Sequence, residues 1–211
     1  MRRFAPLLLL LVAGCGGGER TVETRQVEPY DRIEVSESLD VQVVPGDGRE
    51  VRVAAGELVI DRVVTESSGG VLTIDIRDRG IVIGPDPLND VSVQVPASEL
   101  ASVEIAGSGD VTLEGLDQEA LELRVEGAGD VEASGTVDRL TAEIQGAGDA
   151  RLSQLETRTA RVEVHGAADA ELNVSDELDV TVQGAADVSY TGDPRVRSDI
   201  EGAGDIRRIE P

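Results

Sequence analysis

Six aspartates recur at the same place in a repeated four-residue phrase, and their carboxylates are the main candidates for chemistry in this chain. If the phrases stack at the spacing of neighbouring β-strands, the carboxylates lie about 5 Å apart. Two such charges repel by roughly 0.8 kcal/mol at the dielectric constant of water. Solvent, backbone amides or cations must offset that repulsion. The six residues are Asp110, Asp130, Asp149, Asp169, Asp187 and Asp205.

Three interpretations of these carboxylates are open. In the one we favour, each carboxylate accepts hydrogen bonds from nearby turn amides, as in an Asx-turn. The second is a Ca²⁺ site, which needs roughly six to eight oxygen ligands, and the third is loose binding of counter-ions. Calcium-binding β-rolls use a nine-residue motif, GGxGxDxUx, which this chain does not repeat. We therefore assign no metal ligand and no cofactor.

The repeated phrase predicts a tight turn. Its first residue is always Gly, its second is Ser or Ala, and its third is Gly except at Ala168 and Ala186. An invariant glycine indicates a positive φ or a place without room for a Cβ atom. Successive first glycines are 18 to 20 residues apart, and they are Gly107, Gly127, Gly146, Gly166, Gly184 and Gly202.

An alternating strand precedes each turn. Before the second turn, for example, Leu121, Leu123 and Val125 alternate with polar residues, which predicts a half-buried β-strand. The first inward residue lies nine positions before the aspartate in all six copies, whereas the other half of the unit varies in length. Constant register beside variable loops is typical of stacked coils. We predict an all-β fold, a right-handed parallel β-helix or β-roll of about six coils of 18–20 residues.

The part before the repeats is β-rich but less periodic, and it predicts hairpins. A Pro-Gly-Asp-Gly turn separates Val41–Val44 from Val51–Ala54, and a Ser-Ser-Gly-Gly turn separates Val63–Thr65 from Val71–Ile76. Both are typical hairpin patterns. A further strand is expected at Ile81–Ile83.

The start of the chain has the pattern of a bacterial lipoprotein signal. Arg2 and Arg3 are basic, Leu7–Val12 is apolar but too short to span a bilayer, and Val12–Cys15 resembles a lipobox. Cleavage before Cys15, the only cysteine, would leave its thiol to carry a lipid. The alternative is an ordinary secretory signal with an unrelated cysteine. We expect membrane attachment through Cys15 and a location in the cell envelope, at the outer membrane or cell surface.

The chain therefore divides into three predicted segments. Residues 1–14 are the lipoprotein signal peptide, and residues 15–26 are the lipidated cysteine and a flexible tether. Residues 27–211 are a single domain, with irregular strands over 27–100 and the repeats over 101–206.

Charge and composition exclude several classes of function. The chain has 19 basic and 42 acidic residues, a net charge of −23, and without Arg2 and Arg3 the balance is 17 against 42, or −25. Nucleic-acid binding is excluded because no basic stripe can neutralise phosphates. The chain has no Trp, two Tyr and one Phe, so it lacks platforms for stacking sugar rings. His165, the only histidine, is expected on the surface before a turn.

Several segments resemble one known family, the head GIN domain of auto-transporter adhesins, a domain of unknown function. They are YDRIEVSESLDVQVVPGDGREVRV, VLTIDI, VSVQVPASELASVEIAGSGDV and the GAGDV and GAADA turns. The resemblance covers about Val27 to Ile206. It implies a β-helix-like stack in a bacterial envelope protein, often a lipoprotein, and it defines no catalytic residue. Ala168 and Ala186 depart from it, since the family prefers a second glycine there.

We therefore expect a non-enzymatic, lipid-anchored envelope protein whose rigid acidic solenoid serves binding or adhesion. The sequence does not name the ligand, and it leaves the oligomeric state open. One alternative is a carbohydrate-active enzyme on the same scaffold. Another is an adhesin head stabilised by calcium.

Overall fold

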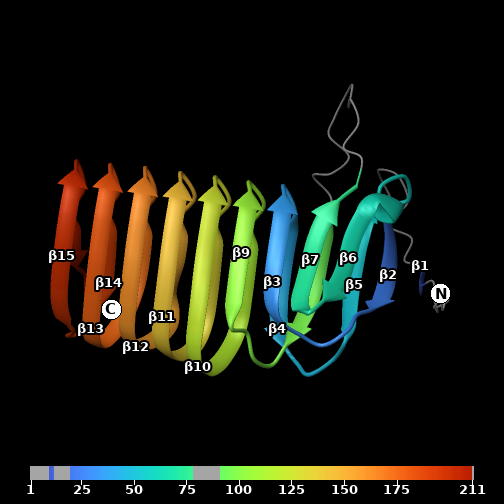
Figure 1. Cartoon of the computed structure of the whole chain (residues 1–211), viewed down its shortest axis with the longest axis horizontal. Coiled ribbons are helices and arrows are strands. Elements are labelled where there is room, and N and C mark those ends of the chain that lie inside the picture. Colours follow the sequence, from blue (N-terminus) through green and yellow to red (C-terminus); the bar gives the residue numbers. More distant parts are fainter. Residues whose placement is uncertain (1–9, 12–19, 78–90, 211) are drawn as a thin grey trace.

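The structure, a computed structural model, describes residues 10–11, 20–77 and 91–210, and it is almost entirely β-strand. Cys15 and the expected strand at Ile81–Ile83 lie outside the described residues. The strands stack side by side along the long axis of the molecule (Figure 1). A 3₁₀ turn, η1 (Ile60–Arg62), is the one helical element in the described part. None of the helical structure described there is long and apolar enough to cross a membrane.

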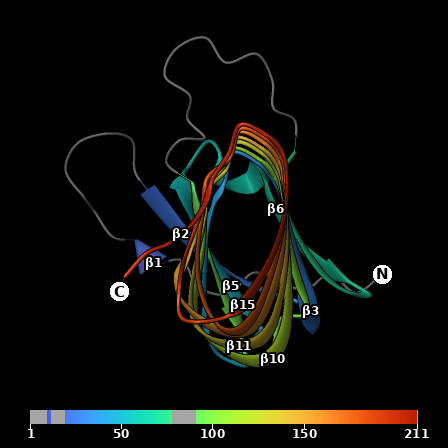
Figure 2. The ribbon, with the colours of Figure 1, turned by 90° about the vertical axis from the view of Figure 1, so that its left-hand side faces the viewer.

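Four long strands form the regular part of the fold, and each bends so that it contributes to both faces of a narrow solenoid (Figure 2). Neighbours pair in parallel and in register, for instance Val111 with Val131 and Gly127 with Gly146. The register shifts lie in the middle of these strands, as between Leu113 and Leu116, where the sequence tolerates changes in length. The predicted parallel solenoid is confirmed. The four strands are β10 (Val111–Gly127), β11 (Val131–Gly146), β12 (Ala150–Gly166) and β13 (Ala170–Gly184).

The number of coils differs slightly from the prediction. The chain forms about five complete coils rather than six. A coil runs from one turn to the next, so six turns delimit five coils. The fifth coil consists of β14 (Val188–Thr191) and β15 (Arg195–Gly202). On one face β14 pairs with β13 and with β16 (Ile206–Arg208), while β15 pairs with β13 on the other face.

The first half of the chain extends both faces of the solenoid. One face continues from β10 through β4, β8, β5 and β2, and the other continues from β10 through β9, β3, β7 and β6. The ranges are β2 (Arg20–Gln26), β3 (Tyr30–Glu37), β4 (Asp40–Pro45), β5 (Glu50–Gly56), β6 (Val63–Ser68), β7 (Gly70–Ile76), β8 (Ser92–Ala97) and β9 (Ser102–Gly107).

One of the two predicted hairpins is confirmed and the other is wrong. β6 and β7 pair antiparallel, as predicted. Strands β4 and β5 do not form a hairpin with each other, because β8 lies between them, parallel to β4 and antiparallel to β5. Strand β8 buries Val93 and Val95, so it continues the apolar inner face between β4 and β5.

The segment predicted as a flexible tether is also partly wrong. Residues 20–26 form β2, which pairs antiparallel with β5 from Arg20–Gly56 to Gln26–Glu50. Strand β2 carries few apolar residues, so its order depends on backbone pairing with a sheet edge rather than on burial. Strand β1 (Leu10–Leu11) pairs antiparallel with β2 and lies within the predicted signal peptide.

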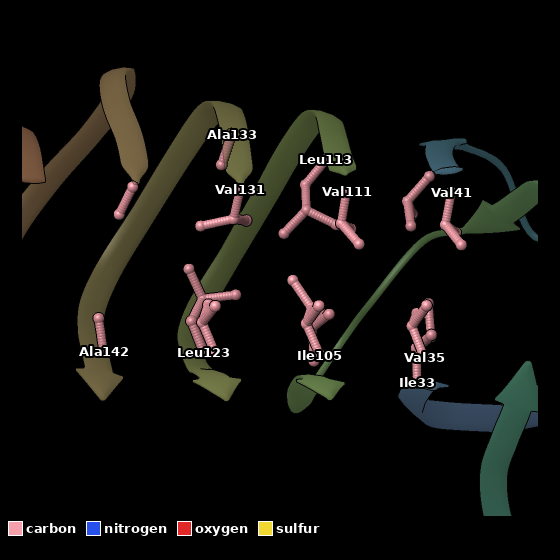
Figure 3. Packing of buried hydrophobic residues seen from close by; sticks show 14 of the residues in the cluster. Ile33, Val35, Val41, Ile105, Val111, Leu113, Leu123, Val131, Ala133 and Ala142 are labelled. Carbon is pink, nitrogen blue, oxygen red and sulfur yellow. The ribbon is translucent and has the colours of Figure 1, made fainter. Parts of the chain in front are cut away.

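The core consists of apolar columns that run along the solenoid between its two faces (Figure 3). Side chains from opposite faces, such as Val131 and Leu123, point toward each other across the narrow interior. Every member of the two columns given next is at most 2 % exposed. One column is Val35, Ile105, Val125, Ile144, Val164 and Val182, and the other is Val41, Val111, Val131, Ala150, Ala170 and Val188.

The two ends of the solenoid differ. At the first end, η1 and its neighbours close the core, with Val59, Ile60 and Val63 at most 4 % exposed. Arg25 of β2 fastens this cover, since its guanidinium donates to the carbonyl oxygens of Ile60, at 2.7 Å, and Val63. At the last end, β15 is exposed along its whole length.

The first glycine of each turn satisfies both predicted reasons for its presence. All six have φ between 127° and 147°. A Cβ atom added to any of them would lie 1.9–2.2 Å from a carbonyl oxygen of the preceding turn. Successive turns therefore approach each other more closely than any side chain allows.

Gly146 provides a direct test of this close approach. We expect Gly146→Ala to lower the free energy of unfolding by about 3 kcal/mol or more, because the new Cβ combines backbone strain with a collision against the carbonyl oxygen of Gly127. Gly56→Ala is the matched control, since nothing lies within 4 Å of its added Cβ, and it should change the value by less than about 0.5 kcal/mol. Urea unfolding measures both. Equal stabilities of the two variants would contradict the role assigned to the turn glycines.

Candidate functional site

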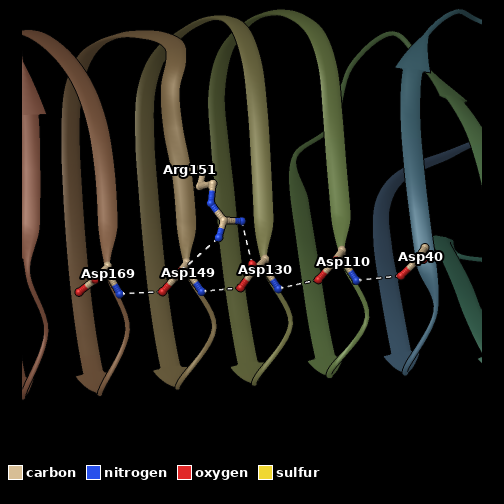
Figure 4. A network of polar contacts seen from close by, with 6 residues as sticks. All are labelled: Asp40, Asp110, Asp130, Asp149, Arg151 and Asp169. Carbon is tan, nitrogen blue, oxygen red and sulfur yellow. Dashed lines mark hydrogen bonds and ion pairs between the residues drawn. The ribbon is translucent and has the colours of Figure 1, made fainter. Parts of the chain in front are cut away.

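The six predicted aspartates lie in one file along an edge of the solenoid, and Asp40 begins that file. Figure 4 shows the part of the file from Asp40 to Asp169. We call Asp40, Asp110, Asp130, Asp149, Asp169, Asp187 and Asp205 the aspartate row. Each member from Asp110 onward lies immediately before the strand that follows its turn, and Asp40 is the first residue of β4. None of the seven is buried, so the row is a surface feature.

Hydrogen bonds between successive turns hold the row in place. Each aspartate from Asp110 onward donates its backbone N–H to the Oδ1 atom of the preceding member. The N–Oδ1 distance is 3.3 Å for the first two steps and 2.9–3.1 Å for the other four. The carboxylate is thus an acceptor for a turn amide, but the donor belongs to the next coil rather than to its own turn.

Backbone hydrogen bonds accompany each of these contacts. At one step, Ala147 donates to the carbonyl oxygen of Gly127 at 2.8 Å, and Val131 donates to that of Asp149 at 2.9 Å. The same pattern is repeated from turn to turn along the row. Three hydrogen bonds therefore connect neighbouring turns, which fixes the spacing of the carboxylates along the edge.

Asp40 is the one member of the aspartate row that was not predicted from the sequence. Its turn reads Glu37-Ser38-Leu39-Asp40 and lacks both glycines. Glu37 takes the first place with a φ of 69°, and within the described residues no similar turn stacks before it. A spacing signal was nevertheless present, since Ile33 precedes Asp40 by seven residues, as Val103 precedes Asp110.

Arg151 bridges two consecutive members of the row. Its Nη1 lies 2.7 Å from Oδ2 of Asp130, and its Nη2 lies 3.3 Å from Oδ2 of Asp149. The hydrogen bond from the Asp149 amide, together with Arg151, holds the pKa of Asp130 below its ordinary value despite partial burial. The same contact raises the pKa of Arg151. Two carboxylates here share one cation, which offsets part of their repulsion.

His165, the other residue considered for a site from the sequence, does not belong to a cluster of metal-binding side chains among the described residues. His165 is on the outer surface of β12, in a column with Gln145 and Gln183, and its Nδ1 is 3.1 Å from Oε1 of Gln183. Among the residues that the structure describes, no group of three or more His, Cys, Asp or Glu side chains is arranged to hold a metal ion. The row can therefore order a line of negative charge, with one oxygen of each carboxylate up to Asp187 engaged by a backbone amide.

Substitutions at Asp169 can distinguish the effect of its hydrogen bond from the effect of its charge. The Oδ1 atom of Asp169 accepts a hydrogen bond from the Asp187 amide at 3.1 Å. We expect Asp169→Ala to lower the free energy of unfolding by about 1 kcal/mol, because the Asp187 amide loses its acceptor. Asp169→Asn retains an oxygen acceptor and removes a repulsive charge, so it should stay within about 0.5 kcal/mol of the wild type. Equilibrium unfolding in urea measures the difference. A larger loss for Asn than for Ala would show that the charge itself stabilises the turn.

Asp130 predicts how part of the stability depends on pH. Because folding lowers the pKa of its carboxyl group, the ionised form is favoured in the folded state. The resulting stabilisation is present above the unfolded pKa and is lost as the pH falls through the lower, folded value. Urea unfolding of the wild type and of Asp130→Asn between about pH 5 and pH 2 should show a steeper loss in the wild type. Parallel pH profiles would contradict this assignment.

Comparison with solved structures gives the same fold in proteins of low sequence identity. A crystal structure of a putative adhesin from Bacteroides fragilis NCTC 9343 is 16 % identical, with a TM-score of 0.73 over 92 % of this chain and 98 % of that one. From Parabacteroides distasonis ATCC 8503, a putative adhesin is 19 % identical with a TM-score of 0.59, and a putative lipid binding protein is 20 % identical with a TM-score of 0.55. Both cover 92 % of this chain and 98 % of their own. No curated protein matches the chain.

The sequence profile of one protein family matches residues 29–194, which include most of the strands and five of the six glycine-led turns. The resemblance noted in the sequence is thereby confirmed. The chain belongs to the family described as putative auto-transporter adhesin, head GIN domain.

Proposed function

We propose that this chain is a non-enzymatic protein of the bacterial cell envelope, anchored by a lipid on Cys15, and that its acidic solenoid acts in adhesion. The description of the family and the names of its structural neighbours, adhesins and a lipid binding protein, support a role of the adhesion type. They also suggest a function without catalysis, at the cell surface.

The aspartate row is the observation that carries this proposal. Its members are fixed to the backbone of the next turn and stay at least partly exposed. A rigid line of carboxylates at about 5 Å intervals favours ligands that carry positive charge at several points, or anionic polymers bridged by cations. Since the charges are already positioned, little conformational entropy is lost when such a ligand binds.

The proposed anchor would orient the row relative to the membrane. Cys15 precedes Arg20, where β2 begins, by five residues, which can span at most about 18 Å. Strand β2 lies near the first end of the solenoid, at the right of Figure 1, and the aspartate row runs from there toward β15. The row would therefore extend away from the membrane that holds the lipid.

Two changes in the chain test the anchor and the row separately. We expect Cys15→Ser to move the protein from the membrane fraction to the soluble fraction, because no thiol remains to carry the diacylglyceryl group.

We expect Asp110, Asp169 and Asp205, each changed to Asn, to leave the protein in the membrane but to lower adhesion of the producing cells to a polylysine-coated surface several-fold.

The matched control removes three exposed acids outside the row, by Glu104→Gln, Glu126→Gln and Glu171→Gln. It changes the net charge by the same amount and should lower adhesion less than the row variant does. An equal loss in the control would mean that overall charge, not the row, is responsible. Membrane retention of Cys15→Ser would contradict the lipid anchor.

A further inference from the structure

Strand β15 is the last strand of one face, and within the described residues it pairs on one side only, with β13. Its inward residues are incompletely covered. Val196 and Ile200 are 37 % and 39 % exposed, whereas Leu178 and Val182, their register partners in β13, are 0 % exposed. A further strand placed along this edge would bury both side chains and would satisfy the free backbone groups of the edge.

The charges of β15 are arranged with opposite signs about its centre. The strand reads Arg195-Val196-Arg197-Ser198-Asp199-Ile200-Glu201 before its final glycine. Both bases precede Ser198, both acids follow it, and one apolar residue stands between the charges on each side. A strand of this kind is complementary to its own reversed copy.

We propose that β15 pairs antiparallel with β15 of a second copy of this chain, about a two-fold axis that passes at Ser198. In that register, Arg197 lies opposite the partner's Asp199, and Arg195 lies opposite the partner's Glu201. Directly opposed residues in an antiparallel pair project to the same face of the sheet. The charge pairs therefore lie on the outer surface.

The same register continues the core. Val196 lies opposite the partner's Ile200, and the two-fold axis repeats the contact, so four apolar side chains would meet in the interior of the joined solenoids. Because each of them is more than one third exposed in the single chain, the pairing removes apolar surface from water. This adds an attraction that does not depend on salt to one that does.

The neighbouring strand β13 and the outer strand β6 lack this property. The equivalent stretch of β13, from Glu177 to Gln183, carries two acids and no base, so its reversed copy offers no opposite charge. At the first end of the solenoid, the outer strand β6 carries Glu66 as its single charged residue, and η1 and Arg25 already cover that end. Strand β15 thus combines an open edge with two bases and two acids that are complementary to their reversed copy.

Pairing through β15 would place the two first ends at opposite extremes of an elongated dimer, since β2 and β15 lie far apart along the long axis (Figure 1). If Cys15 carries a lipid, which rests on the proposed function, the two anchors would point away from each other. The dimer would then connect two membranes, such as those of neighbouring cells. The pairing itself does not depend on the lipid and can be tested without it.

Sedimentation velocity on residues 15–211 with Cys15→Ser measures the association in the absence of lipid. Every buried apolar residue of the described core lies between Ile33 and Val188, so this chain keeps the whole core. We expect a reversible dimer whose dissociation constant rises with salt concentration. A monomer at every concentration up to about 100 μM would overturn the proposal.

Charge reversal on the acidic half of β15 identifies the interface. Asp199→Arg with Glu201→Arg places like charges opposite Arg197 and Arg195 at four symmetry-related contacts, and should raise the dissociation constant at least tenfold. The acidic half is the better target, because Arg197 also forms an ion pair of 2.5 Å with Glu177 of its own chain. Glu104→Arg with Glu171→Arg, the same charge change on exposed residues of other strands, is the control and should leave the dimer intact.

Mixing two variants provides the sharpest test. A chain with Arg195→Glu and Arg197→Glu has an acidic β15, and the chain with Asp199→Arg and Glu201→Arg has a basic one. Each should be monomeric alone, and an equimolar mixture should form a heterodimer. Thermal unfolding of each variant shows whether its solenoid is intact. Dimers that survive charge reversal, or folded variants that do not combine, would exclude this pairing.

Discussion

The close stacking of turn backbones is the constraint on which the rest of this structure depends. A carbonyl oxygen of one turn lies only 1.9–2.2 Å from the position that a Cβ atom of the next turn would take. Only with that Cβ absent can the following amide reach the glycine carbonyl at 2.8–2.9 Å and the aspartate amide reach Oδ1 of the preceding aspartate. The same spacing sets the distance between the strands that follow, so the apolar columns inside and the carboxylates outside share one repeat.

The repeats were predictable from sequence because each coil carries its own copy of the information. Each unit contains its own turn residues, its own alternating inward residues and the same distance from these to the aspartate. When such units stack, only one register buries all the inward residues. The position of β8 was not predictable in this way. A Pro-Gly-Asp-Gly turn between alternating strands favours a local hairpin, yet β8, about forty residues later in the sequence, competes for the same edge of β4 and fits the apolar inner face.

Two other features, Asp40 and strand β2, were not predicted for a common reason. Both lie at the start of the stack of strands, where the repeat pattern does not apply. Asp40 was overlooked because its turn lacks glycine. Among the described residues no similar turn stacks before it, so no Cβ collision arises there and Glu37 and Leu39 are tolerated. Strand β2 was taken for a tether because Arg20–Gln26 has little apolar alternation. An outermost strand buries little, and its pairing with β5 is specified by backbone hydrogen bonds that sequence pattern does not record.

The choice of aspartate for the row follows from a balance between attraction and repulsion. A hydrogen bond to an ionised acceptor is roughly twice as strong as one between neutral groups, and each carboxylate from Asp40 to Asp187 gains one from the next turn. Repulsion between neighbours at about 5 Å costs only roughly 0.8 kcal/mol in water, and the row remains in contact with water. Asparagine would avoid the repulsion, but it would exchange each ionised acceptor for a weaker neutral one, so the two effects oppose each other. The amides use Oδ1 of each carboxylate up to Asp187 and leave Oδ2 to the surface, and Arg151, the one base bound to the row in the described residues, bridges Oδ2 of Asp130 and Oδ2 of Asp149.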